Sequence, residues 1–399
     1  MKPIHPPKRA FALLICLVAF CLLGPTHPLK ANGQDQATVT VGALLDLSGP
    51  DSSIGVSAYK AIRLAAEEIN RQGGIKGRKL NIAVFDTKGQ KDLLLLGAGK
   101  LQHEYGALAL LGPTAEANVT LFRRYGETNK IPVVLIQGLE PILKFAGVKT
   151  AWTFSTTLNF DAELKALFKY FKMKRYETLG GLLDNTASVR KVGLWIRGYA
   201  PEYGMKITCL GSFNPNQDDF AMKLRYLSRC APDIAIIWTG WPASSLVQTN
   251  LRGIDVPIAL SHQIFFKDPQ TLALPVGSLI YIVVPPILFS HAVPSTCLSY
   301  FVTKRFVDLW GHDFQTMPPV QQLAAGQAWD GICLLRRAMS ATQRLSPKEI
   351  RYSLERNIAP FVGVTGVFSP NKRDHSGLSP NSLLLLRCMG SRWSLVKRH

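Results

Sequence analysis

The sequence lacks the motifs that would indicate catalysis. It contains no Gly-x-Ser-x-Gly nucleophile turn and no Gly-x-x-x-x-Gly-Lys phosphate loop. No Cys-x-x-Cys pair and no cluster of Cys and His indicates a metal or redox site. The adjacent carboxylates Glu67 and Glu68 fall at the end of an expected helix, where solvent would surround them. We therefore expect a protein that is not an enzyme and that holds no cofactor or metal.

The histidines give no catalytic pattern either. All eight stand apart from one another, and only His262 and His291 are candidates for a functional role. A single histidine in a loop is more often a surface group than a catalytic base. We therefore expect both to be surface groups.

Acidic residues are scarce, with 27 Asp and Glu against 46 Lys and Arg, for a formal net charge of +19. Such a surface attracts anionic partners over long range. The basic residues are nevertheless scattered, with no run of five or more, and no recognised nucleic-acid-binding module is present. We expect a solvated basic surface and no nucleic-acid partner.

After the N-terminus, no apolar segment is long enough for a membrane span. Ala10–Leu23 has 14 residues without charge and follows Lys2, Lys8 and Arg9. A spanning helix needs about 20 such residues, so this segment is typical of a secretory signal peptide. We expect residues 1–31 to be removed after Ala31 on export; a retained membrane anchor is the alternative.

Cysteines are few, and those after residue 31 are odd in number. In an oxidising compartment an odd count leaves at least one thiol unpaired. Buried single thiols are the expectation, and a Cys209–Cys230 disulfide is the alternative. The five are Cys209, Cys230, Cys297, Cys333 and Cys388.

Residues 39–86 have the pattern of a βαβ unit. An apolar run at 39–45 predicts a strand buried on both faces. Apolar residues recur at helical spacing from 56 to 70, as in an amphipathic helix. Gly73 and Gly74 then provide a left-handed helix cap, and residues 80–85 form the next strand.

The same alternation continues along the chain and predicts parallel α/β sheets with right-handed crossovers. In such sheets, ligands bind in the loops after the carboxyl ends of the strands. Those loops begin at Asp46, Asp86, Gly112 and Gln137. The alternation of strands and helices is interrupted at 151–159 and again at 279–284, before Pro285-Pro286. We expect these two segments to be crossings between lobes.

The βαβ stretch resembles a known family. Its Ser-Gly-Pro at 48–50, the later Gly55, Glu-Glu-Ile-Asn at 67–70, GGIKGRKL at 73–80 and a strand ending at Asp86 are similar to the opening of type I periplasmic solute-binding proteins. The group with the greatest resemblance binds branched-chain amino acids and amides for ABC transporters. The resemblance implies two Rossmann-like lobes joined by three hinge crossings. Lobe 1 would comprise 37–155 and 287–360, and lobe 2 would comprise 156–286 and 361–399.

The resemblance also points to ligand-binding positions. The family's carboxylate-binding serine corresponds to Glu116, and its Ala-Ala-Thr corresponds to Gln137-Gly138-Leu139. In lobe 2, the family's tyrosine corresponds to Ser188, its aromatic residue to Trp241, and its acidic residue to Gln263. The candidate ligand-binding residues are Ser48, Ile54, Pro113, Thr114, Glu116, Gln137, Gly138, Leu139, Asp184, Ser188, Trp241 and Gln263.

These replacements remove the groups that would clamp an amino acid's carboxylate and ammonium. A zwitterion buried without paired charges costs several kcal/mol per ion. We therefore expect an amide, aromatic or cationic ligand rather than a plain α-amino acid. A shift of two residues in the correspondence would instead restore Thr114 as a hydroxyl donor. Each position also has a structural alternative: core packing for Trp241, a turn for Gln137, a helix cap for Ser188 and solvent for Glu116.

The resemblance implies a monomeric periplasmic protein that captures a small molecule and passes it to an inner-membrane ABC permease. Two alternatives remain open. The same module occurs in ligand-sensing receptors and regulators, and a hydrolase could have a site that carries no recognisable motif.

Overall fold

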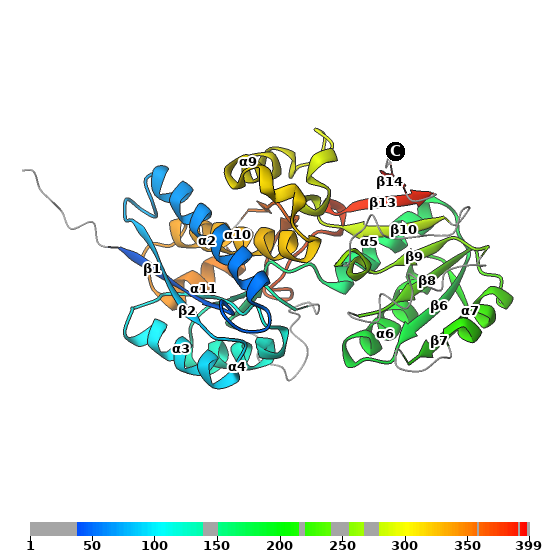
Figure 1. Ribbon diagram of the computed structural model, residues 1–399, viewed down its shortest axis with the longest axis horizontal. Coiled ribbons are helices and arrows are strands. Elements are labelled where there is room, and N and C mark those ends of the chain that lie inside the picture. Colours follow the sequence, from blue (N-terminus) through cyan, green and yellow to red (C-terminus); the bar gives the residue numbers. More distant parts are fainter. Residues whose placement is uncertain are drawn as a thin grey trace, which may run out of the picture. The chain divides into compact units, whose positions relative to one another are not determined.

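The strands of this protein form two larger sheets and one small hairpin, seen in the computed structural model (Figure 1). The structure describes residues 38–138, 151–214, 220–240, 255–266, 279–356, 359–389 and 392–396. Within these ranges, no helix has both the length and the apolar character needed to cross a membrane. The expected α/β fold with two lobes built on parallel sheets is confirmed.

The first sheet has five strands, all parallel, in the order β2-β1-β3-β4-β5. Strand β1, which lies between β2 and β3, is buried along its whole length, as its predominantly apolar sequence predicts. The strands are β1 (Val39–Leu45), β2 (Leu80–Asp86), β3 (Leu110–Gly112), β4 (Val133–Leu135) and β5 (Thr153–Ser155).

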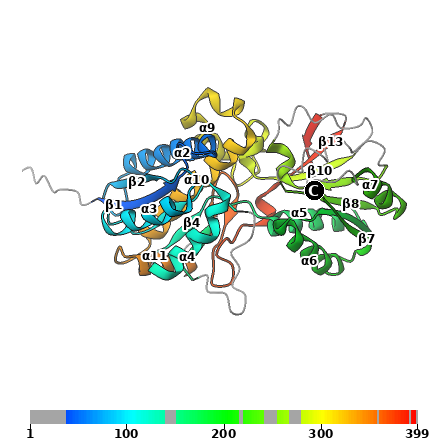
Figure 2. The ribbon, with the colours of Figure 1, turned by 60° about the horizontal axis from the view of Figure 1, so that its bottom comes forward.

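Helices cover both faces of this sheet, because side chains alternate between the faces along each strand. Ala43 and Leu45 of β1 belong to the hydrophobic cluster that includes α2, whereas Leu44 packs in the cluster of α3 and α4. Helix α10 lies beside α2 in both views (Figures 1 and 2). The helices are α2 (Ser52–Arg71), α3 (Lys91–His103), α4 (Val119–Asn129), α9 (Tyr300–Trp310), α10 (Pro319–Ser340) and α11 (Pro347–Arg356).

Helix α2 follows the expected pattern closely. The predicted apolar stripe is buried, with Ala58, Ile62 and Ala65 fully inaccessible to solvent. The helix ends at Arg71, and the glycines that follow have φ of +95° at Gly73 and +72° at Gly74. Glycine takes this left-handed conformation at little cost, so the predicted cap is confirmed.

The second sheet has seven strands in the order β14-β13-β10-β9-β8-β6-β7. The five from β10 to β7 are parallel, and β13 and β14 extend the sheet in antiparallel orientation. Its strands are β6 (Thr178–Asp184), β7 (Lys206–Phe213), β8 (Ile234–Trp238), β9 (Ile258–Leu260), β10 (Ile280–Val284), β13 (Leu384–Met389) and β14 (Arg392–Leu395). The helices in this part of the chain are α5 (Phe160–Met173), α6 (Ala187–Glu202) and α7 (Phe220–Arg229).

Two segments expected to be crossings contain sheet strands. Residues 151–159 include β5, which pairs with β4, and residues 279–284 include β10, which pairs with β9. The first expectation was right for residues 156–159, which lead from β5 of the first sheet to the elements of the second. The second placed the crossing one strand too early, because a short strand before a Pro-rich segment looks like a linker until its pairing partner is known. The chain leaves the first sheet after Ser155 and the second after Val284.

The C-terminal segment forms two antiparallel pairs. β11 (Phe361–Val362) pairs with β12 (Val367–Phe368), and β13 pairs with β14. Only two residues separate β13 from β14, and so short a connection permits antiparallel pairing alone. Short 3₁₀ helices complete the described elements: η1 (Glu116–Asn118), η2 (His262–Phe266), η4 (Pro286–Ala292), η5 (His312–Thr316) and η6 (Pro380–Ser382).

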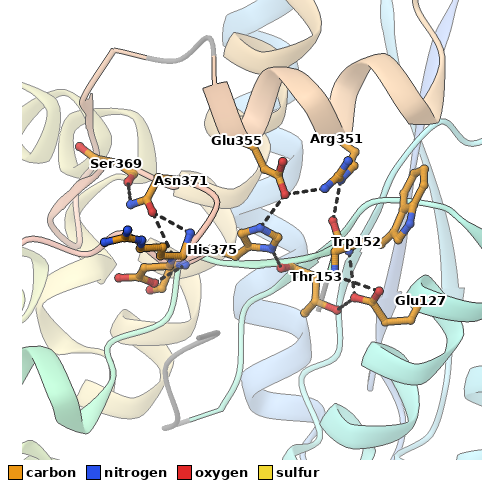
Figure 3. A network of polar contacts seen from close by, with 12 residues as sticks. Glu127, Trp152, Thr153, Arg351, Glu355, Ser369, Asn371 and His375 are labelled. Carbon is orange, nitrogen blue, oxygen red and sulfur yellow. Dashed lines mark hydrogen bonds and ion pairs between the residues drawn. The ribbon is translucent and has the colours of Figure 1, made fainter. Parts of the chain in front are cut away.

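A buried polar network joins α11, β5 and the segment after β12 (Figure 3). His375 Nδ1 lies 2.8 Å from the carbonyl oxygen of Thr153, and its Nε2 lies 3.0 Å from Glu355 Oε1. Arg351 donates to the same Glu355 oxygen at 2.6 Å, and the ring of His375 stacks on Phe154 at 4.3 Å. Both ring nitrogens of His375 therefore face oxygen atoms that can accept hydrogen bonds.

Asp330 of α10 makes a second buried connection to the C-terminal segment. Its carboxylate accepts hydrogen bonds from the backbone N–H groups of Val364 and Thr365, each at 2.8 Å, and from the Thr365 hydroxyl. Gly363 must remain glycine here, because a Cβ would lie 2.4 Å from the carboxylate. Complete burial outweighs these hydrogen bonds and raises the pKa of Asp330 to about 7.

This raised pKa predicts a pH-dependent stability. The folded state binds the proton of Asp330 more tightly than the unfolded state does. Its stabilising contribution to the free energy of unfolding is therefore fully present below the unfolded-state pKa of 3.8, and it is lost as pH rises through the folded-state pKa of about 7. We expect the free energy of unfolding to fall by up to about 1.4 kcal/mol per pH unit over this window. Asp330→Asn should remove this contribution and so reduce the fall in the free energy of unfolding over the window, as measured by urea unfolding at several pH values.

The exposed carboxylate of Asp308 on α9 provides a matched control. Asp308→Asn should retain the slope of the parent protein. An Asp330→Asn variant with the same pH dependence as the parent would show that Asp330 does not titrate in this range.

Candidate ligand-binding pocket

A pocket of about 250 Å³ opens where loops from both sheets meet helix α10. In the first sheet, these loops follow the carboxyl ends of β1, β3, β4 and β5, and in the second sheet the loop follows β9. This is the position where α/β sheets bind ligands. The described lining residues are Asp51, Ile54, Thr114, Glu116, Gln137, Gly138, Leu158, His262, Gln263, Val320, Leu323 and Gln327.

The loop after β1 is held by the fully buried carboxylate of Asp46. Its oxygens accept hydrogen bonds from the backbone N–H groups of Gly49 at 2.6 Å and Asp51 at 2.9 Å. The backbone N–H of Asp46 donates to the Thr114 hydroxyl at 2.8 Å. One residue therefore fixes the position of the pocket residues on the loops after β1 and β3.

Helix α2 begins unusually close to the end of β1. A Cβ at Gly55 would lie 1.6 Å from the carbonyl oxygen of Asp46, a distance that no side chain tolerates. Glycine at this position brings the neighbouring Ile54 against the pocket. Gly55 is one of the residues on which the family resemblance depends.

Two carboxylates line the pocket on the side of the first sheet. Burial, and then the neighbouring carboxylate of Asp46, raise the pKa of Asp51. Burial, and then the charge of Asp51, raise the pKa of Glu116. The side chain of Glu116 is reached by solvent, yet the surrounding protein removes enough water to disfavour its charged form.

On the side of the second sheet, His262 and Gln263 line the pocket. His262 was expected at the surface, but it is fully buried, and that expectation was wrong. The carboxylate of Glu163 on α5 holds it, accepting from the backbone N–H at 3.0 Å and lying 2.8 Å from Nδ1. Gln263 is 4% exposed, and its Oε1 has no hydrogen-bond partner within the described residues.

Helix α10 supplies the third wall, through Val320, Leu323 and Gln327. The amide of Gln327 is satisfied by the protein, since it can donate to the carbonyl of Ile136 at 2.8 Å and accept from the N–H of Leu158 at 3.0 Å. Gln327 therefore shapes the pocket rather than offering free hydrogen-bonding groups to it.

The structure places half of the predicted site residues together in this pocket. Those that line it are Ile54, Thr114, Glu116, Gln137, Gly138 and Gln263. Leu139 and Trp241 lie outside the described residues, as does the side chain of Ser188. The roles of all twelve residues stay predictions.

Three predicted residues are described but do not line the pocket. The Ser48 hydroxyl donates to Asp86. Pro113 is buried directly before Thr114. Asp184 accepts a hydrogen bond from the backbone N–H of Gly240.

Other lining residues were missed by the sequence reasoning. Val320, Leu323 and Gln327 have the i, i+3, i+7 spacing of one helix face, but that spacing does not say what the face contacts. Asp51 follows the Ser-Gly-Pro motif directly and could have been included on that ground. Among the described residues, no group of three or more His, Cys, Asp or Glu is placed to hold a metal ion.

The close approach at Gly55 leads to a testable prediction. Gly55→Ala should lower the thermal midpoint, because the added methyl group forces α2 away from Asp46 at a cost of about 1–3 kcal/mol. Gly99→Ala in α3 is the control, since a Cβ there meets nothing within 4 Å and alanine favours the helix. Equal thermal midpoints for the two variants would contradict the assigned packing.

The sequence matches the family model described as periplasmic binding protein over residues 38–383. Two curated relatives match shorter regions. An uncharacterised protein of Methanocaldococcus jannaschii is 28% identical over 119 residues, and the chemotactic signal transduction system substrate-binding protein BasB of Halobacterium salinarum is 31% identical over 111 residues. These matches cover 29% and 27% of this chain, and the chain spans little more than a quarter of each relative, 28% and 27%.

Solved structures share the fold at low sequence identity. An extracellular ligand-binding receptor from Rhodopseudomonas palustris HaA2 has a TM-score of 0.68 at 18% identity. The branched-chain amino acid transporter substrate-binding protein LivJ from Streptococcus pneumoniae, solved with isoleucine, has a TM-score of 0.63 at 19% identity. Each comparison covers 90% of this chain and 100% of the other. This chain therefore belongs to the periplasmic binding protein family and has the type I fold of its branched-chain amino acid-binding members.

Proposed function

We propose that this protein is exported to the periplasm, captures a small polar ligand in the pocket and delivers it to an ABC permease of the inner membrane. The observation that carries the proposal is a pocket at the strand ends, lined from both sheets, in a chain of this family. The proposal includes an N-terminal signal peptide at residues 1–31 and a monomeric protein. The lobes would be 37–155 with 287–360, and 156–286 with 361–399.

The lining also supports a ligand other than a plain α-amino acid. None of the described lining residues is Lys or Arg, so an α-carboxylate would find no positive side chain there. Thr114 can offer its hydroxyl proton, but Glu116 lines the same pocket and would repel an anion. We therefore favour an amide, an aromatic compound or a cation as the ligand.

The ligand would be bound and released unchanged. Binding would stabilise one arrangement of the two lobes through differential affinity, without a covalent step. Family membership supports this proposal, since the family consists of binding proteins.

A thermal-shift screen over amino acids, amides, polyamines, aromatic acids and sugars tests the binding function. A true ligand should raise the thermal midpoint by mass action, adding about 2.7 kcal/mol at a hundredfold excess over Kd. Mass spectrometry should recover that ligand unaltered after incubation. Conversion to a product would instead support the hydrolase alternative, and a screen without any shift would count against binding.

Sensing is a second candidate function, favoured by the similarity to BasB, whose name assigns it to chemotactic signal transduction. Deleting the gene in its source organism separates the two roles. Loss of uptake of the radiolabelled ligand would support transport. Normal uptake with loss of a chemotactic or transcriptional response would support sensing.

A further inference from the structure

Negative charge gathers on one side of the pocket. Asp46, Asp51 and Glu116 come from the loops after two neighbouring strands, β1 and β3. Each carboxylate influences the next, as the raised pKa values of Asp51 and Glu116 show. The described lining contains no Lys or Arg that would balance this charge.

The protein satisfies only the first of these carboxylates. Asp46 is held by two backbone N–H groups. Within the described part of the chain, the Asp51 and Glu116 carboxylates form neither an ion pair nor a side-chain hydrogen bond. Burial and like charge are the only causes that act on their pKa values, and both causes raise them. An ionised carboxylate that is partly desolvated and unpaired is costly, and a bound cation would remove that cost.

An independent observation comes from the second sheet. Gln263 lines the pocket, and its Oε1 is buried without a donor within the described residues. A buried amide oxygen without a partner is unfavourable, so a ligand that supplies an N–H group there removes that cost on binding. The pocket thus presents two carboxylates and an amide oxygen, all of them hydrogen-bond acceptors.

The remaining lining defines the rest of the ligand. Ile54, Leu158, Val320 and Leu323 are apolar and suit a short hydrocarbon portion. The volume of about 250 Å³ lies just below the usual range of small-molecule sites, roughly 300–1,000 Å³, and so suits a small ligand. A small compound with one apolar part and a head group rich in N–H donors fits these features.

We propose that the ligand is a small organic cation with several N–H donors, a primary amine or a guanidine, and without a carboxylate. The inference rests on the proposed binding function and specifies its ligand class. The cation lies against Glu116 and Asp51, where its charge-assisted hydrogen bonds are stronger than neutral ones. One of its N–H groups donates to Gln263 Oε1.

Four probes that share one hydrocarbon group test this proposal by isothermal titration calorimetry. They are 3-methylbutylamine and 3-methylbutylguanidine as cations, 3-methylbutylurea as a neutral isostere of the guanidine, and leucine as the zwitterion. The cations should bind at least about tenfold more tightly than the urea or leucine, a difference of about 1.4 kcal/mol. A urea or leucine that binds as tightly as both cations would overturn the proposal.

Variants identify the charges responsible. Glu116→Gln and Asp51→Asn should each weaken cation binding about tenfold or more and leave urea binding unchanged. Neither side chain makes a hydrogen bond that stabilises the fold, and Asp51 does not cap α2 through its side chain, so neither variant should lower the unliganded thermal midpoint. Glu104→Gln, which removes an exposed carboxylate outside the pocket, is the matched control and should change nothing.

The results separate this inference from the broader function. If the thermal-shift screen finds a neutral or zwitterionic ligand and no cation, the cation proposal fails and the binding function stands. If no compound in the screen or among the four probes binds, both fail. If cations bind but Glu116→Gln and Asp51→Asn leave their Kd unchanged, the assigned carboxylates are wrong and the proposal falls.

Discussion

The pocket depends on one buried carboxyl group, that of Asp46. An unpaired carboxylate would be very costly in this position, and two backbone N–H groups satisfy it only if the chain after β1 turns back tightly over its side chain. That turn brings Asp51 to the pocket, and the glycine at position 55 lets α2 start against the strand. The loop after β3 is fixed by the same residue through Thr114.

Asp46 also sets the electrostatics of the site. Its carboxylate, together with burial, raises the pKa of Asp51, and Asp51 with burial raises that of Glu116. Asp46 is needed to hold the loop after β1, and its charge also affects the pKa of a carboxylate that lines the pocket. Glu116 in turn adds a carboxylate to the lining of the pocket.

Local patterns were sufficient to predict much of the fold. The run of β-formers at β1, the apolar stripe of α2 and the glycines after it are all encoded within a few residues of where they act. The strands β5 and β10 were not recognised, since each is short and is defined by its pairing, β5 with β4 and β10 with β9 and β13, rather than by its local pattern. The antiparallel edge formed by β13 and β14 is likewise a matter of pairing, which periodicity does not specify.

The candidate site shows the same division. The loops after β1, β3 and β4 could be predicted, because parallel strands bring their carboxyl ends to one edge. The position of His262 in the pocket could not be predicted, because its burial depends on Glu163, which lies 99 residues earlier in the sequence. The α10 residues had the spacing of a helix face, and only the three-dimensional arrangement shows that this face meets the pocket.

Helix α10 contributes residues both to the pocket and to the contact with the C-terminal segment. Leu323 and Gln327 line the pocket, and Asp330, less than one turn after Gln327, holds the backbone at Val364 and Thr365. The Gln327 carbonyl also accepts a hydrogen bond from Thr156, on the segment that follows β5. Because α10 is one continuous helix, a movement of Leu323 along the helix axis also moves Gln327 and Asp330. It therefore reaches both the segment after β5 and the C-terminal segment at Val364 and Thr365.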